Sequence, residues 1–129
     1  MESRNGTKRI LVVDDSKNIL QTLKNLLEVK GYRCEGASTG IDALCAIVKE
    51  RPDCIFMDKD CSDLDGFQLC ALLKEKEEYR DIPFILMTDR EDAFDNAKAT
   101  VLGAKQMLCK PFGNAELMSS LELADVRAT

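Results

Sequence analysis

The chain has 129 residues, the size of one ordinary domain, and this length predicts a single hydrophobic core. Hydrophobic residues make up 45% of the sequence and charged residues 32%, which is typical of a soluble globular protein. A net charge of -5 argues against a nucleic-acid-binding surface. The first residues lack the apolar stretch of a signal peptide and no apolar run is long enough to cross a bilayer, so we expect neither secretion nor membrane insertion. We therefore expect a cytoplasmic protein without nucleic-acid or membrane partners.

Five short apolar runs predict five strands, each followed by a stretch with helical periodicity. The second strand is more polar than the others, which favours a place at an edge of the sheet. The strands are expected at residues 8–13, 32–37, 54–57, 83–88 and 104–109, and the helices at 16–30, 40–50, 66–78, 91–102 and from 114 onward.

Two of these helices carry large apolar residues that we expect to face the core. They are Val48 in the second helix, and Phe94 and Val101 in the fourth, which we expect to be the most loosely held helix. This alternation of strands and helices predicts an α/β fold with a parallel sheet, right-handed crossovers and helices on both faces.

The six cysteines could indicate disulfides or a metal site, but the sequence contains no C-x-x-C pair and no histidine. We predict free thiols that pack as small apolar groups, with a redox role considered only for Cys61 in an acidic loop. Strand positions are expected for Cys34, Cys54 and Cys109, and core-facing helix positions for Cys45 and Cys70.

Polar side chains follow four of the predicted strands at the point where each strand ends. They are Asp14 and Asp15, Asp58, Thr88 and Lys110. Because the carboxyl ends of parallel strands share one edge of the sheet, these groups are expected to converge. Clustered carboxylates predict a Mg²⁺ site, and a lysine and a hydroxyl beside it suit a phosphoryl group. With no base-activated serine or cysteine available, the predicted nucleophile is a carboxylate and its product an acyl phosphate.

The order and spacing of these motifs resemble the receiver domain of bacterial two-component response regulators. The resemblance rests on Ile10 to Asp15, Pro52 to Asp58 followed by Asp65-Gly66, Ile85 to Thr88, and Gly103-Ala104 leading to Lys110-Pro111-Phe112. It implies a doubly wound, flavodoxin-like fold with five parallel strands in the order 2-1-3-4-5. We expect a flexible tail at 1–7, the receiver domain at 8–124 and a C-terminal tail at 125–129.

The resemblance also implies a role for the acidic residues. Asp58 would accept a phosphoryl group from a sensor histidine kinase or a phosphotransfer protein, with Mg²⁺ as the cofactor. Asp15 would bind Mg²⁺ directly and Asp14 largely through water, while Asp58 and the backbone carbonyl of Asp60 would supply further ligands.

Signalling would depend on the other strand ends. By the same resemblance, Lys110 would pair with the phosphoryl oxygens. The Lys110-Pro111 peptide bond is typically cis in this family. Thr88 would turn to hydrogen-bond the phosphoryl group and shift the surface made by the fourth helix, the fifth strand and the fifth helix, where a downstream protein target binds.

The sequence departs from the family pattern at several positions. Cys61-Ser62 replaces the usual Met-Pro, which predicts a less rigid loop. Asp89 replaces a small residue after the switch threonine, and with Asp60 it is expected to slow phosphoryl entry or to alter attack of water on the acyl phosphate. Met107 replaces the usual aromatic switch residue; it either weakens the coupling from Thr88 or fills the same space.

Parts of the sequence also suit two other functions. Asp58-Lys-Asp60 also resembles the nucleophile motif of haloacid-dehalogenase-type phosphohydrolases, but that family places its metal-binding acidic pair after the lysine. A receiver-like binding module that works without phosphorylation is the second alternative. Apart from self-phosphorylation and autodephosphorylation, we do not expect an enzyme. The sequence is compatible with a stand-alone receiver and with a fragment of a longer protein.

Overall fold

The computed structural model describes residues 7–128, which form one five-stranded parallel sheet in the order β2-β1-β3-β4-β5. The predicted α/β class and strand order are confirmed, and the polar second strand lies at an edge, as expected. In chain order the elements are β1 (Arg9–Val13), α1 (Lys17–Val29), β2 (Arg33–Ala37), α2 (Gly40–Lys49), β3 (Cys54–Asp58), α3 (Gly66–Lys74), β4 (Phe84–Thr88), α4 (Ala93–Leu102), β5 (Gln106–Cys109) and α5 (Asn114–Leu123).

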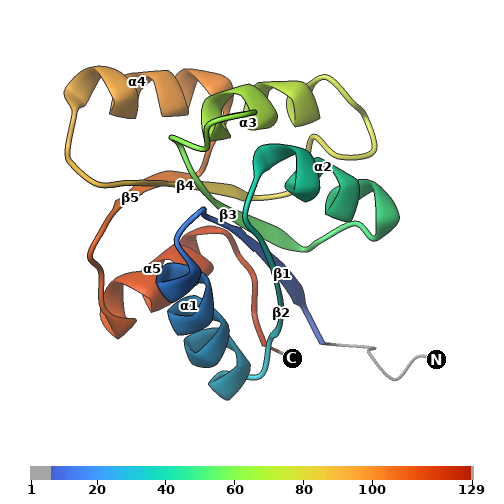
Figure 1. The fold of residues 1–129 in the computed structure, drawn as a ribbon, viewed down its shortest axis with the longest axis vertical. Coiled ribbons are helices and arrows are strands. Elements are labelled where there is room, and N and C mark those ends of the chain that lie inside the picture. The colour runs from blue at the N-terminus through green and yellow to red at the C-terminus, as the bar shows by residue number, and fades with distance from the viewer. Residues whose placement is uncertain (1–6, 129) are drawn as a thin grey trace.

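The sheet lies between two helical layers, with α1 and α5 on one face and α2, α3 and α4 on the other (Figure 1). Every residue of β1, β3 and β4 is buried, because helices cover both faces of these three strands. This double burial explains why their sequences are continuous apolar runs rather than alternating ones. It also means that the ends of these strands are where polar side chains can reach solvent.

Four apolar or thiol side chains expected in the core point outward, so these predictions are wrong. In α4, Phe94 is 77% exposed and Val101 84% exposed, and Ala99 is the buried residue of that helix. In α2, Val48 is 63% exposed and Cys45 is exposed. Each helix covers the sheet with a narrow stripe of residues, and periodicity alone cannot tell which of two apolar stripes faces inward.

The chain continues to pack after α5. Val126 is buried in the core on the α1 and α5 side, and its carbonyl oxygen accepts a hydrogen bond of 2.8 Å from the Tyr32 hydroxyl. The expected tail at 1–7 lies outside the described residues except for Thr7, and the expected limits of the domain stay a prediction. Within residues 7–128, every helix is too short or too polar to cross a membrane.

Candidate functional site

Four strand ends bring the predicted site residues to one edge of the sheet. Asp58 is the last residue of β3 and Thr88 the last of β4, while Asp14 follows β1 and Lys110 follows β5. Backbone hydrogen bonds extend the ladders past the strands: the Asp14 amide donates to Ala37 over 3.1 Å, and the Lys110 amide donates to Thr88 over 2.7 Å. The convergence expected from the sequence is therefore built by the sheet itself.

Three carboxylates form the centre of the site. One carboxylate oxygen from each of Asp14, Asp15 and Asp58 lies within 4.8 Å of the other two. Asp14 and Asp58 are buried, whereas Asp15 is exposed. Backbone amides orient the buried pair, because the Ser16 amide donates to Asp14 over 2.9 Å and the Asp60 amide donates to Asp58 over 2.8 Å. The cluster therefore has two fixed carboxylates and one that is open to solvent.

Lys110 supplies the positive charge of the site. Its ammonium group lies 2.9 Å from Asp14, 3.0 Å from Asp58 and 3.5 Å from Asp89. Burial alone would lower the pKa of Lys110, but the hydrogen bonds and charges of Asp14 and Asp58 outweigh it and raise the pKa. The lysine is therefore charged at neutral pH. The Lys110-Pro111 peptide bond is cis, as the resemblance implies.

The donor set fits a hard divalent cation. Asp14, Asp15 and Asp58 offer carboxylate oxygens, the ligands that Mg²⁺ prefers, and Lys110 leaves the cluster with a surplus of negative charge. The three carboxylates and Lys110 line an open cavity of about 350 Å³ together with Asp89 and other residues. A metal ion and a phosphoryl group can therefore reach Asp58 from solvent.

The two predicted switch residues are buried or half-buried beside the site. The Thr88 hydroxyl donates a 3.0 Å hydrogen bond to the carbonyl oxygen of Arg90 and accepts one of 3.3 Å from the Arg90 amide. Thr88 therefore holds the loop between β4 and α4 with its hydroxyl. Met107 is half-buried in β5 and packs against the core on the α2, α3 and α4 side, next to Leu86 in register.

The two additional carboxylates differ in where they point. Asp89 lines the cavity and its side chain is 81% exposed, so it competes for Lys110 at the mouth of the site. Asp60 instead accepts hydrogen bonds of 2.9 and 3.0 Å from the ammonium group of Lys59. The Asp60 carboxylate is thus paired with Lys59, a partner that the sequence did not predict.

The loop between β3 and α3 is anchored by residues that the sequence analysis missed. The Asp63 carboxylate accepts hydrogen bonds of 2.9 and 3.0 Å from the amides of Gly40 and Ile41, at the start of α2. The hydrogen bonds from these two amides lower the pKa of Asp63, and the one from Ile41 has the larger effect. A Cβ atom at Gly40 would lie 2.0 Å from the Leu64 carbonyl oxygen, so only glycine allows this contact.

Cys61 lies in the same loop and is buried, at 5% exposure. Burial first, and then the charge of Asp58 and neighbouring carboxylates, raise the pKa of Cys61 to about 12. Its thiol is therefore neutral and shielded, which removes the basis for a redox role. With Cys61 buried and Asp63 bound to α2, the loop is held by contacts other than the Met-Pro pair of the family.

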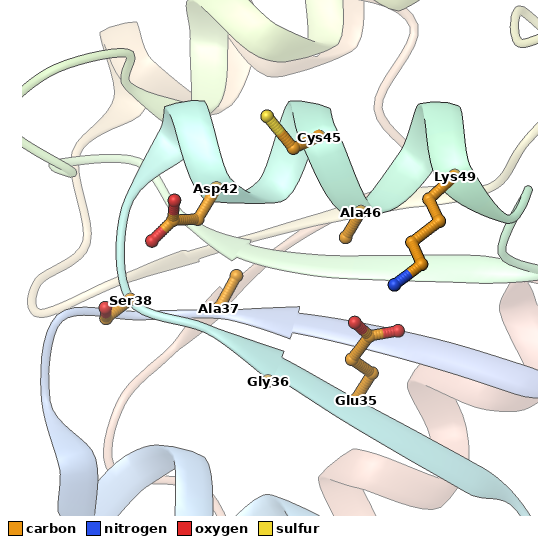
Figure 2. Close-up of a pocket in the computed structure, with 8 residues that line it drawn as sticks. All are labelled: Glu35, Gly36, Ala37, Ser38, Asp42, Cys45, Ala46 and Lys49. Carbon is orange, nitrogen blue, oxygen red and sulfur yellow. The ribbon is translucent and has the colours of Figure 1, made fainter.

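A second cavity, of about 390 Å³, lies between the edge strand β2 and α2 and contains none of the predicted site residues (Figure 2). The Glu35 and Lys49 side chains point towards one another across it, whereas Cys45 points away from β2 (Figure 2). Its charged residues, Glu35, Asp42 and Lys49, are of both signs and do not form a cluster of carboxylates. Its size therefore does not make it a rival to the site around Asp58.

Comparison with known proteins identifies the family. The family model of the response regulator receiver domain matches residues 10–122. Protein PilG of Pseudomonas aeruginosa is 36% identical over 122 residues, which cover 95% of this chain and 90% of PilG. Response regulator MprA of Mycobacterium avium is 34% identical over 113 residues, and the matched part covers 88% of this chain but 49% of MprA. This chain thus spans about half the length of MprA.

Solved structures agree with this assignment. Chemotaxis protein CheY4 of Vibrio cholerae superposes with a TM-score of 0.84 at 28% identity, covering 90% of this chain and 97% of CheY4. The receiver domain of sensor histidine kinase PA1611 from Pseudomonas aeruginosa was solved with a magnesium ion in its active-site cleft. It superposes with a TM-score of 0.81 at 28% identity, and the match covers 92% of this chain and 98% of the PA1611 receiver domain. The chain belongs to the receiver-domain family of response regulators.

Proposed function

We propose that Asp58 accepts a phosphoryl group from the phosphohistidine of a sensor histidine kinase or a phosphotransfer protein. One observation carries this proposal: the buried Asp58 carboxylate lies 3.0 Å from the ammonium group of Lys110, within a cluster of further carboxylates. Receiver domains of response regulators are signalling domains that interact with histidine kinases and downstream targets, which supports the choice of donor.

In the proposed reaction, a carboxylate oxygen of Asp58 attacks phosphorus. An O–P bond forms while the P–N bond to the donor imidazole breaks, and the imidazole leaves with the electron pair and takes up a proton. Lys110 stabilises the negative charge on the transferred oxygens. Attack of water on phosphorus later returns the Asp58 carboxylate and inorganic phosphate.

The residues that would hold Mg²⁺ are Asp14, Asp15 and Asp58, with the backbone carbonyl of Asp60. Bound Mg²⁺ supplies positive charge that offsets the charge of the incoming phosphoryl oxygens. The chain contributes the orientation, since backbone amides fix Asp14 and Asp58 while exposed Asp15 lines the open cavity.

The proposed switch is an exchange of hydrogen bonds at Thr88. Its hydroxyl would leave the Arg90 carbonyl oxygen, to which it donates over 3.0 Å, and bind the phosphoryl group instead. A neutral hydrogen bond contributes about 1 kcal/mol, whereas one to a charged group contributes about 2 kcal/mol, so the exchange favours the phosphorylated arrangement. Met107 would transmit the shift to the surface made by α4, β5 and α5, where a downstream protein would bind.

The proposal is tested by incubating the protein with acetyl phosphate and Mg²⁺ and measuring its intact mass. We expect the mass of one phosphoryl group to be added, and the addition to be lost in Asp58→Asn and when Mg²⁺ is chelated. A mass gain that persists in Asp58→Asn would contradict the assignment of the nucleophile. No gain in the parent protein would favour the binding module that works without phosphorylation.

Asp60 and Asp89 are proposed to tune the rate of this reaction. Because Asp89 lies 3.5 Å from Lys110 and adds a negative charge at the mouth of the cavity, Asp89→Ala should take up phosphate faster in the same assay. Equal rates of uptake and of decay in Asp89→Ala and the parent would contradict this role.

We also propose that residues 8–124 act as one receiver unit in the cytoplasm, through contacts with proteins rather than nucleic acids or membranes. The net charge of -5 supports this choice of partners. The phosphohydrolase alternative is set aside, because the matched family is a family of signalling domains.

A further inference from the structure

Lys59 follows the proposed phosphoacceptor directly, and its backbone and side chain contact different parts of the molecule. The Lys59 amide donates to Met87 over 2.9 Å, which extends the β3–β4 ladder by one residue. Its ammonium group donates to both carboxylate oxygens of Asp60 and lies 3.5 Å from Asp95. The backbone of Lys59 is thus fixed by the sheet. Its side chain joins the loop between β3 and α3, residues 59–65, to α4; we call this loop the phosphorylation loop.

The position of Asp95 makes this contact relevant to α4 as a whole. Asp95 is the third residue of the helix, and its amide and that of Phe94 donate to the N-cap residue Asp92. The buried residue of α4, Ala99, lies outside its first turn, so polar contacts such as that of Asp95 with Lys59 help to hold this turn. The Lys59 side chain is 13% exposed and that of Asp95 24%, so water screens their ion pair only in part.

We propose that Lys59 is a positioning residue that couples the metal-binding loop to α4. Its ammonium group holds Asp60 and Asp95 together, so the Asp60 backbone, which would supply a carbonyl oxygen to Mg²⁺, and the first turn of α4 become ordered together. Without Lys59, Asp60 and Asp95 lose the cation that both contact, and their like charges repel. The inference rests on the proposed function, since it requires Mg²⁺ to bind at the carboxylate cluster.

The test measures hydrogen exchange of the amides of residues 93–96 with and without saturating Mg²⁺, in the absence of any phosphodonor. In the parent protein we expect Mg²⁺ to slow this exchange about threefold, a coupling of the size seen between linked sites. The slowing should be lost in Lys59→Met and in Asp95→Asn. The double variant should respond like either single variant, because both remove the same link.

Lys98→Met is the matched control. Lys98 is also on α4 and also contacts a neighbouring element, with its ammonium group 4.4 Å from the centre of the Phe67 ring on α3. Within residues 7–128 it makes no hydrogen bond or ion pair with the phosphorylation loop. Removing it should loosen α4 without abolishing the response to Mg²⁺. Lys59→Arg, which retains the charge, should keep most of the response.

The inference is overturned if Lys59→Met keeps the full slowing, if Lys98→Met loses it equally, or if bound Mg²⁺ leaves residues 93–96 of the parent unchanged. Calorimetric titration with Mg²⁺ separates this failure from that of the proposed function. If Mg²⁺ binds but α4 does not respond, only the coupling through Lys59 is wrong. If Mg²⁺ does not bind, the metal site of the proposed function is wrong as well.

Discussion

At the N-terminal end of the sheet, buried charge is matched by opposite charge, whereas at the C-terminal end Asp14, Asp58 and Asp89 share the ammonium group of Lys110. Arg9 begins β1, is 4% exposed and contacts both Glu35 and Glu50. Arg33 begins the neighbouring strand and binds Glu50 through two hydrogen bonds of 3.2 and 3.3 Å. The difference separates a charge cluster that is neutralised within the fold from one that keeps a surplus of negative charge.

Arg9→Met should break the balanced end and give the largest effect at neutral pH. The loss of the nearly buried Arg9 charge removes the cation that contacts Glu35 and leaves Glu50 with Arg33 alone. Such a loss costs about 3–5 kcal/mol for a fully buried pair. Because Glu35 and Glu50 are 49% and 39% exposed, we expect about 2 kcal/mol in the free energy of unfolding, measured by urea denaturation.

Arg33→Met is the control for this prediction, because the Arg33 side chain contacts the same Glu50 but is 38% exposed. Its cost should stay below about 1 kcal/mol. Equal losses in the two variants would show that burial of Arg9 is not what makes the N-terminal cluster structural.

Alkaline pH should lower the free energy of unfolding through the thiol of Cys54, which begins β3 at the N-terminal end of the sheet. Burial raises the pKa of Cys54 from 9.0 to about 12, so the folded state keeps this thiol neutral while the unfolded state ionises it. This contribution is fully present below pH 9 and is lost between pH 9 and pH 12, at up to about 1.4 kcal/mol per pH unit.

The measurement is the free energy of unfolding as a function of pH in reducing buffer. The free energy of unfolding of Cys54→Ala should fall less steeply above pH 9 than that of the parent. Cys45→Ala is the control, because the exposed Cys45 thiol changes its surroundings little on unfolding. A parent and a Cys54→Ala variant with parallel curves would contradict the assignment.

Asp15→Asn should act in the opposite direction to Arg9→Met, with the smallest effect. Asp15 is exposed and adds repulsion to buried Asp14 and Asp58, so removing its charge should stabilise the metal-free protein by up to about 1 kcal/mol. Added Mg²⁺ should raise the melting temperature of the parent by more than that of the variant. Destabilisation of metal-free Asp15→Asn would mean that the charges at the C-terminal end of the sheet are also balanced.

The sequence predicted the strand ends well because it records which residue ends each apolar run. Asp58 and Lys110 could be assigned to one site without coordinates, since a parallel sheet brings the ends of its strands together. Side-chain partners across elements could not be assigned in this way. The contacts of Lys59 with Asp95 and of Asp63 with the start of α2 depend on side-chain direction, which spacing along the chain does not encode.

The errors in α4 have a related physical cause. Phe94 and Val101 are seven residues apart and lie on one stripe, a pattern that also occurs in core-facing helices. Only the packing of α4 against α3 and β5 decides that this stripe faces outward. The family contacts implied by resemblance covered the site, but they did not include the residues that are particular to this chain.

Gly40 has no functional group, does not line the cavity around Asp58, and still restricts that site. Because its missing side chain allows the Leu64 backbone to lie against the start of α2, any larger residue would push the phosphorylation loop away from the position that Asp63 holds. In a library of all single substitutions, position 40 should therefore tolerate as few residues as a catalytic position. The sensitivity of position 40 to substitution would come from steric exclusion alone. A map of mutational sensitivity would therefore reveal Gly40, whereas a search for reactive side chains would not.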